Sequence, residues 1–250
     1  MSVSGTHAYL TLTKSTKVLS FTADDIIKCI GFLIDNSFIM FRGVIYRQVI
    51  GIPMGISCGP HLANVFLSVY EKDFIQQLVE EDNISDAKLL SDVCRYQDDC
   101  LVINDDNLFN SVFEKIYPPS MKLDRTNISR DKTNYLDCTI SIHRGKFIYK
   151  SYDKRQSYNF KVINYPDLIS NVPIGPTYGV FTSQLLRFCE INNIVDNFKK
   201  DIMELIEKLR AQNFNLKVLR LKYLDFCIRY INTWGKYGID ITEFSEHIFN

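Results

Sequence analysis

The sequence predicts an α+β fold, in which an antiparallel sheet with helices on one face is followed by an all-helical part. Three observations predict it. Between residues 21 and 152, short β-prone runs bounded by turn residues alternate with amphipathic helical segments. From residue 177 onward, only helical periodicity remains. Residues 153–176 follow neither pattern and are rich in basic and aromatic side chains, so we expect three parts: residues 1–152, 153–176 and 177–250.

Composition argues against several classes of protein. The chain has 250 residues, enough for a large core, and its 46% hydrophobic content argues against disorder. No apolar stretch approaches the roughly 20 residues that span a bilayer, so we expect no membrane partner. Residues 1–7 lack the basic and apolar regions of a signal peptide. Seven cysteines without a CxxC pair favour reduced thiols in an intracellular compartment, either nucleus or cytoplasm, and argue against a zinc site.

The formal net charge is zero, but the charges are unevenly distributed. Residues 71–140 contain 8 Lys/Arg and 15 Asp/Glu, whereas residues 141–235 contain 15 Lys/Arg and 8 Asp/Glu. An acidic centre beside a basic region suits a metal-dependent enzyme that acts on a polyanion. Solvated helix faces produce the same split, so the charge pattern is only mild support for this interpretation.

Local signals place the individual elements. Thr22 is a suitable N-cap for a helix over residues 22–36, and the acidic pair Asp24 and Asp25 favours its first turn. Residues 80–86 are expected to be an acidic linker. The β-prone runs predict strands at residues 9–13, 38–41, 44–50, 121–128, 135–142 and 146–152. Apolar periodicity predicts helices at residues 60–80, 107–117, 178–192, 195–212, 217–234 and 242–248.

Residues 51–60 contain five glycines or prolines, which predicts a loop whose backbone can approach a ligand closely. The long helix that follows has Ser57 as a candidate N-cap and Pro60 in its first turn. A glycine-rich loop that leads into a helix N-terminus is a phosphate-binding arrangement. Many loops enter helices in this way, so the loop alone is a weak signal.

Two adjacent aspartates, Asp98 and Asp99, lie between β-prone runs, which predicts a tight hairpin with both carboxylates near its tip. Neighbouring carboxylates repel each other unless a cation lies between them, and Mg²⁺ prefers oxygen ligands together with substrate phosphates. This chemistry suits two-metal phosphoryl transfer, in which two ions about 4 Å apart bind the attacking and leaving oxygens. A solvated acidic turn is the alternative interpretation of the same pair.

The connector at residues 153–176 interleaves Lys and Arg with aromatic residues such as Tyr158 and Phe160. Basic side chains neutralise phosphates, and aromatic rings stack on bases. The alternative is that these two rings are simply buried under a long loop.

Taken in order, these motifs resemble the central blocks of reverse transcriptases. Residues 96–99 (Tyr-Gln-Asp-Asp) resemble the catalytic hairpin of that family. The other matching segments are residues 48–55 and 59–67, which resemble the block before the hairpin, residues 134–137, which resemble a later block near the primer grip, and residues 152–155 and 170–173, which resemble segments of Penelope-like and related metazoan retroelement enzymes. The resemblance extends from about residue 21 to residue 234.

The resemblance implies a polymerase palm followed by a helical thumb, with RNA-directed DNA polymerase activity. Asp98 and Asp99 would be the catalytic and metal-binding residues for Mg²⁺ or Mn²⁺. The residues implied to bind nucleotide and template are Gln48, Gly51, Pro53, Met54, Gly55, Tyr96 and Gln97. The residues implied to bind the primer duplex are Asp137, Lys154, Arg155, Gln184 and Arg187. The implied partners are an RNA or DNA template–primer duplex and deoxynucleoside triphosphates.

The sequence departs from the family pattern at two points. Met54 stands where most members carry Gln, and no Asp-bearing strand precedes the helix that starts near Asp24. We therefore expect a palm and thumb without fingers or the first catalytic strand. Two alternatives stay open: a catalytically inactive nucleic-acid-binding remnant of a retroelement polymerase, and an unrelated structural or protein-binding α+β domain. The sequence leaves the oligomeric state open.

Overall fold

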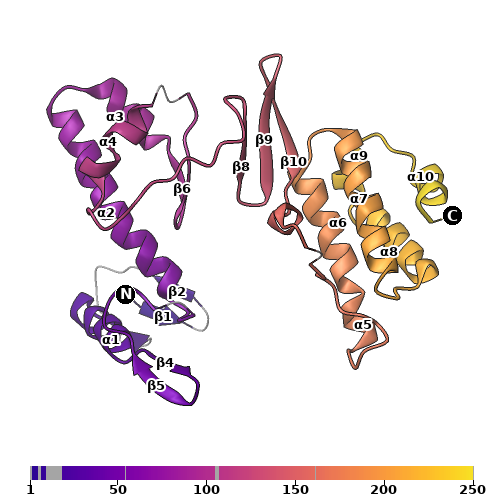
Figure 1. The fold of residues 1–250 in the computed structure, drawn as a ribbon, viewed down its shortest axis with the longest axis horizontal. Helices are drawn as coiled ribbons and strands as arrows, with labels where there is room; N and C mark the ends of the chain where they lie inside the picture. Colours follow the sequence, from indigo (N-terminus) through magenta and orange to yellow (C-terminus); the bar gives the residue numbers. More distant parts are fainter. Residues whose placement is uncertain are drawn as a thin grey trace. The chain divides into compact units, whose positions relative to one another are not determined.

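A computed structural model describes residues 2–4, 7–9, 19–53, 55–104, 107–160 and 162–249. The chain divides into two compact units, Met1–Lys122 and Leu123–Asn250, which are described separately. Both units mix helices with small antiparallel sheets, as Figure 1 shows, which confirms the predicted mixture at a coarse level. The predicted palm-like part, residues 1–152, spans both units, and the palm and thumb boundaries stay a prediction.

The first elements of unit 1 are three short strands and a helix. The strands β1 (Ser2–Ser4), β2 (His7–Tyr9) and β3 (Leu19–Ser20) form an antiparallel sheet in the order β2-β1-β3. The strand expected at residues 9–13 falls mostly outside the described residues. The helix α1 (Ala23–Asp35) begins as predicted, because the Thr22 hydroxyl accepts a hydrogen bond from the Asp25 backbone N–H at 3.2 Å. The Asp25 carboxylate accepts one from the Thr22 N–H at 2.9 Å, which completes a capping box.

The strands β4 (Phe38–Phe41) and β5 (Val44–Arg47) form the predicted hairpin around Arg42 and Gly43, both at positive φ. The second strand ends at Arg47, three residues before the predicted limit. Every residue of both strands is exposed, and so are several apolar residues of α1.

The long helix α2 (Gly59–Glu80) organises the rest of unit 1, and its predicted bounds are confirmed. The helices α3 (Ile84–Ser91) and α4 (Leu108–Ile116) pack against it. The linker expected at residues 80–86 is wrong in its second half, because the Asn83 side chain accepts the Asp86 N–H and caps α3. The buried apolar side chains on these three helices and just after α4 are Leu67, Leu78, Ala87, Leu90, Phe109, Ile116 and Tyr117.

Unit 2 begins with the strands β8 (Lys132–Tyr135), β9 (Cys138–His143) and β10 (Lys146–Ser151), in the order β10-β9-β8. The strand predicted at residues 121–128 is wrong. This stretch has no partner strand among the described residues, so its backbone lacks the series of hydrogen bonds to a neighbouring strand that defines a β-strand. The strand predicted at residues 135–142 is divided by a turn, with Leu136 at a φ of 51°. The described strands form four small sheets and not one continuous sheet.

From residue 179 onward unit 2 is helical, as predicted, although the helix expected at 217–234 is broken near Tyr230. Two short helices at residues 154–157 and 174–177 lie where a connector without helices was expected. The bounds of all these helices are η1 (Lys154–Ser157), α5 (Ile174–Thr177), α6 (Gly179–Ile191), α7 (Val195–Arg210), α8 (Leu216–Arg229), α9 (Ile231–Gly235) and α10 (Ile241–Phe249). Trp234 is buried at their centre, with Phe198 and Tyr223 each 5.3 Å from it between ring centroids. The helices α6 and α7 also contact β10, so the sheet and the helices share one unit.

Candidate functional site

The strands β6 (Cys94–Tyr96) and β7 (Asp99–Leu101) form the predicted carboxylate hairpin. Tyr96 pairs with Asp99, so Gln97 and Asp98 are the two turn residues. Gln97 has a φ of 55°, and both mirror-image turns that join such hairpins need a positive φ at this first position. Asp98, Asp99 and Tyr96 are all exposed. The two carboxylates are therefore presented to solvent at a bend, as expected.

Arg95 holds this turn against α2. Its guanidinium makes five hydrogen bonds. Nε donates to Oε1 of Glu71, and Nη2 donates to Oε2 of Glu71 at 3.1 Å. Nη1 donates to Oδ1 of Asn64 at 2.9 Å, and Nη2 donates to the backbone oxygen of Asn64 at 3.3 Å. The fifth bond runs from Nη1 to the backbone carbonyl of Gln97 at 3.3 Å. The same guanidinium thus contacts the helix and the carbonyl of the turn.

Glu71 is shared between Arg95 and a third element. Its Oε1 also accepts the hydroxyl of Tyr117, the residue after α4, at 2.6 Å. The Arg95 side chain is only 10% exposed, and the hydrogen bond with Glu71 raises the pKa of its guanidinium. Burial raises the pKa of the Cys100 thiol on β7 to about 11, although the nearby Arg95 opposes this. The site is therefore backed by a half-buried polar network.

The glycine–proline loop leads into the same helix. Gly51 and Gly55 have φ values of 84° and 94°, which ordinary residues rarely adopt. Pro53 is buried, and a Cβ atom at Gly59 would lie 3.0 Å from its carbonyl oxygen, so the loop is tightly folded against the helix start. The predicted nucleotide residue Met54 lies outside the described residues.

Two further predictions concern the same loop. The side chain of Gln48 donates to the Ile50 carbonyl at 3.0 Å and so braces the loop entrance. Cys58, not Ser57, occupies the N-cap position of α2, and it makes no side-chain capping bond. The first backbone N–H groups of α2 are therefore not capped by the residue that was expected to do so.

The contacts of Arg95 place the turn along α2. Asn64 is five residues into α2, about 7.5 Å along the axis from Gly59. Since Asn64 and the Gln97 carbonyl bind the same nitrogen of Arg95, the turn lies beside the N-terminal part of α2. The loop enters the helix at that same end.

The donor set near the turn is suited to one cation. No group of three or more His, Cys, Asp or Glu side chains able to hold a metal is found in the described part of the chain. Two adjacent exposed carboxylates still suit a single Mg²⁺, which commonly binds to one or two carboxylates and completes its shell with water and substrate phosphates. They do not by themselves suit a pair of ions.

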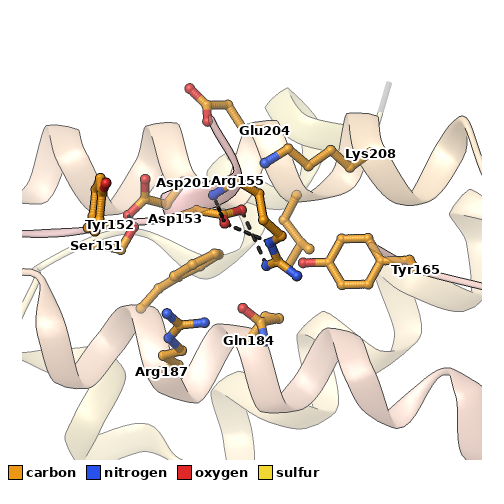
Figure 2. Close-up of a pocket in the computed structure, with 12 residues that line it drawn as sticks. Ser151, Tyr152, Asp153, Arg155, Tyr165, Gln184, Arg187, Asp201, Glu204 and Lys208 are labelled. Carbon is orange, nitrogen blue, oxygen red and sulfur yellow. Dashed lines mark hydrogen bonds and ion pairs between the residues drawn. The ribbon is translucent and has the colours of Figure 1, made fainter. Parts of the chain in front are cut away.

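In unit 2, three of the predicted duplex-binding residues line one small cavity of about 30 Å³, as Figure 2 shows. Gln184 and Arg187 project from α6, and Arg155 projects from η1. A fourth, Asp137, forms an ion pair with Arg187 at 2.9 Å. The fifth, Lys154, is exposed on η1 and is not part of the lining. Sequence positions up to 50 residues apart are thus gathered at one place.

The charges of this cavity are largely paired. Arg155 donates to Asp153 at 2.7 Å; burial opposes ionisation of Asp153, but the hydrogen bonds from Arg155 bring its pKa below the ordinary value. The Nε of Arg187 is buried and has no partner among the described residues. Lys208 completes the lining from α7. A phosphate that bound here would compete with carboxylates for at least two of the cations.

Asp201 is a buried residue of this cavity that the sequence did not single out. Its Oδ2 accepts hydrogen bonds from the Ser151 hydroxyl at 2.5 Å and from the Asn192 amide at 2.8 Å. Burial raises its pKa above the ordinary value for aspartate, against the effect of these bonds. Its place among the apolar residues of an amphipathic helix was the available signal. It ties α7 to β10 and to the end of α6.

The structure contains no helix, among the residues described, that is long and apolar enough to cross a membrane. Comparisons of the chain with protein-family models, with curated proteins and with solved structures found no match.

Proposed function

We propose that the chain carries the catalytic hairpin and the duplex-binding part of an RNA-directed DNA polymerase, which elongates a primer by nucleotidyl transfer. One observation carries the proposal. Arg95 anchors the Asp98–Asp99 turn beside the end of α2 that the glycine–proline loop enters. Two carboxylates, the loop amides and the N-terminus of α2 would together suit a metal-bound triphosphate at this end of the helix.

The residues of the chain have separable tasks in this reaction. Asp98 and Asp99 would hold Mg²⁺ or Mn²⁺, which when bound neutralises phosphate charge and lowers the pKa of an attacking hydroxyl. Gly51 and Gly55 let the loop backbone approach the nucleotide, since no side chain intervenes. Catalysis would come mainly from the position and charge of these groups. The described residues supply two carboxylates for this role, so we expect slow turnover by the chain alone.

The test is primer extension by the full chain on RNA and DNA templates with Mg²⁺ or Mn²⁺. Asp98→Asn keeps the size of the side chain and removes its charge. We expect it to lower incorporation by at least about 100-fold. Asp92→Asn is the matched control, because Asp92 is an exposed acid at the end of α3 outside the site. Equal incorporation by the unmodified chain and Asp98→Asn would rule out the proposed role.

A second candidate function is nucleic-acid binding without catalysis. The observation that favours it is the excess of Lys and Arg in residues 141–235 together with the absence of a third metal-binding side chain from the described residues near the turn. It predicts binding to primer–template duplex that weakens steeply with salt. Asp98→Asn would leave that affinity unchanged, and extension would be undetectable for every variant.

A further inference from the structure

The proposed function uses Arg95 only to locate the turn and assigns no task to its partner Glu71, although the two side chains make several hydrogen bonds. Both residues are at least half-buried, with side chains 10% and 27% exposed. The two carboxylates of the turn, in contrast, are exposed. Their contacts join β6, α2 and the end of α4 through Tyr117.

We propose that Arg95, held in orientation by Glu71, is a positioning residue that fixes the Asp98–Asp99 turn in the arrangement that binds a divalent cation. This inference rests on the proposed function of that turn. Arg95 acts through the Gln97 carbonyl, to which its Nη1 donates at 3.3 Å, and it does not itself touch the cation.

The hairpin alone cannot hold the turn in a single arrangement. Each strand has only three residues, and an isolated two-stranded hairpin is marginally stable in water. Two adjacent carboxylates add repulsion at its tip when no cation is bound. Gln97 also adopts a left-handed backbone that is unfavourable for a residue with a side chain. An external contact with the turn is therefore needed to hold one shape.

The contact requires arginine in particular. One planar guanidinium binds both oxygens of Glu71 on one edge and reaches Asn64 and the turn carbonyl with its remaining N–H groups. Lysine offers a compact charge with three donors and cannot span the same set of acceptors. Because Tyr117 also donates to Glu71, the carboxylate is fixed from the α4 side as well. The position of the turn is thus set by the packed helices of unit 1.

The probe for this inference is Mn²⁺, titrated into the full chain and followed by the paramagnetic resonance of the free ion. The double variant Asp98→Asn/Asp99→Asn gives the background from other carboxylates. Arg95→Lys keeps the charge and removes the bridging geometry, and Glu71→Gln keeps the shape and loosens the arginine. The control is Arg229→Lys, which breaks an Arg–carboxylate pair of 3.0 Å on α8.

We expect Arg95→Lys and Glu71→Gln to weaken the affinity for Mn²⁺ by at least about tenfold, the effect typical of residues that orient metal ligands. Arg229→Lys should leave it unchanged. The number of ions bound at saturation separates positioning from folding: loss of folded protein lowers that number, whereas loss of positioning raises the dissociation constant at an unchanged number. A lower number with an unchanged dissociation constant would overturn the inference.

The two proposals fail in different ways. If the double aspartate variant binds Mn²⁺ as well as the unmodified chain, the turn is not a metal site and the proposed function fails together with the inference. If that variant loses binding but Arg95→Lys and Glu71→Gln retain it, the proposed function stands and the positioning role of Arg95 is wrong.

Discussion

The Nη2 atom of Arg187 lies 2.9 Å from Oδ1 of Asp137, which joins α6 to the turn between β8 and β9. Both residues were expected from the sequence to contact a primer duplex. In the structure they bind each other, so the positive charge of Arg187 is already partly neutralised.

This ion pair leads to the first prediction. Asp137→Asn frees Arg187, so we expect tighter binding to primer–template duplex and a steeper salt dependence, by about one unit in the slope of log K against log salt. Fluorescence anisotropy over a series of salt concentrations measures both. Asp225→Asn is the matched control, because it breaks a similar exposed pair with Arg229. Weaker binding by Asp137→Asn would contradict the prediction.

The second prediction concerns Asp201, whose pKa is raised by burial. A raised pKa means that the folded state holds the proton more tightly. The stability from this group is thus fully present below its unfolded pKa, near 4, and is lost as pH rises through the folded value. In Asp201→Asn, the amide oxygen can still accept from Ser151 and Asn192 without a charge.

We therefore expect Asp201→Asn to lose this part of the pH dependence and to be at least as stable as the unmodified chain at pH 7. Urea unfolding followed by the fluorescence of Trp234, the single tryptophan, measures the free energy of unfolding of unit 2 at each pH. Asp201→Ala loses both hydrogen bonds and should cost about 1–3 kcal/mol. If the free energy of unfolding changes with pH in the same way in the unmodified chain and in Asp201→Asn, the buried carboxylate is not the cause of that change.

The third prediction compares the substitution of glycine by alanine at two positions, where we expect opposite effects on stability. A Cβ atom at Gly59 would lie 3.0 Å from the Pro53 carbonyl oxygen and 3.3 Å from Ile56, so Gly59→Ala should destabilise unit 1 by about 1–3 kcal/mol. Gly31 in α1 has no atom within 4 Å of the same position. Gly31→Ala should stabilise α1 by up to about 1 kcal/mol, the difference in helix propensity. Thermal unfolding followed by circular dichroism compares the two, and equal shifts of both variants would be the contrary result.

Thiol reactivity gives the fourth prediction. With a pKa of about 11, Cys100 is almost entirely a neutral thiol at pH 8 and should react slowly with iodoacetamide. Cys29 is exposed and should react faster, whereas Cys189 and Cys227 are fully buried and should react only after unfolding. Mass spectrometry of peptides after timed labelling measures each rate. Labelling of Cys100 as fast as that of Cys29 would show that the Cys100 thiol on β7 is not shielded beside the polar network.

Local signals in the sequence were enough for much of the fold. The Thr22 cap, the turn at Gly43 and the long helix after the glycine–proline loop depend on neighbouring residues, and each was confirmed. The failures have local causes as well. The stretch at 80–86 is acidic, yet Asn83 caps a helix within it, and the run at 135–142 contains no glycine, yet Leu136 turns the chain.

The candidate site was predictable only in part. The Asp98–Asp99 turn follows from two polar residues between β-prone runs, so the sequence was enough to locate it. The support beneath it depends on contacts between Arg95 and residues 24 and 31 positions away, on one face of a helix. No local pattern states which face of α2 meets which strand, so neither Glu71 nor Tyr117 could be assigned. The same limit applies to Asp201, whose partner Ser151 is 50 residues away.

The left-handed backbone of Gln97 has a consequence for how the chain could vary. Glycine or asparagine at this position would form the bend readily, and the hairpin would then keep its shape when detached from the helix. Glutamine has no such preference, so by the inference above the bend depends on the hydrogen bond from Arg95 to its carbonyl. With glutamine there, the geometry of the two aspartates depends on the packing of unit 1. A substitution that disturbs this packing, far from the surface, is therefore expected to change the position of the two carboxylates.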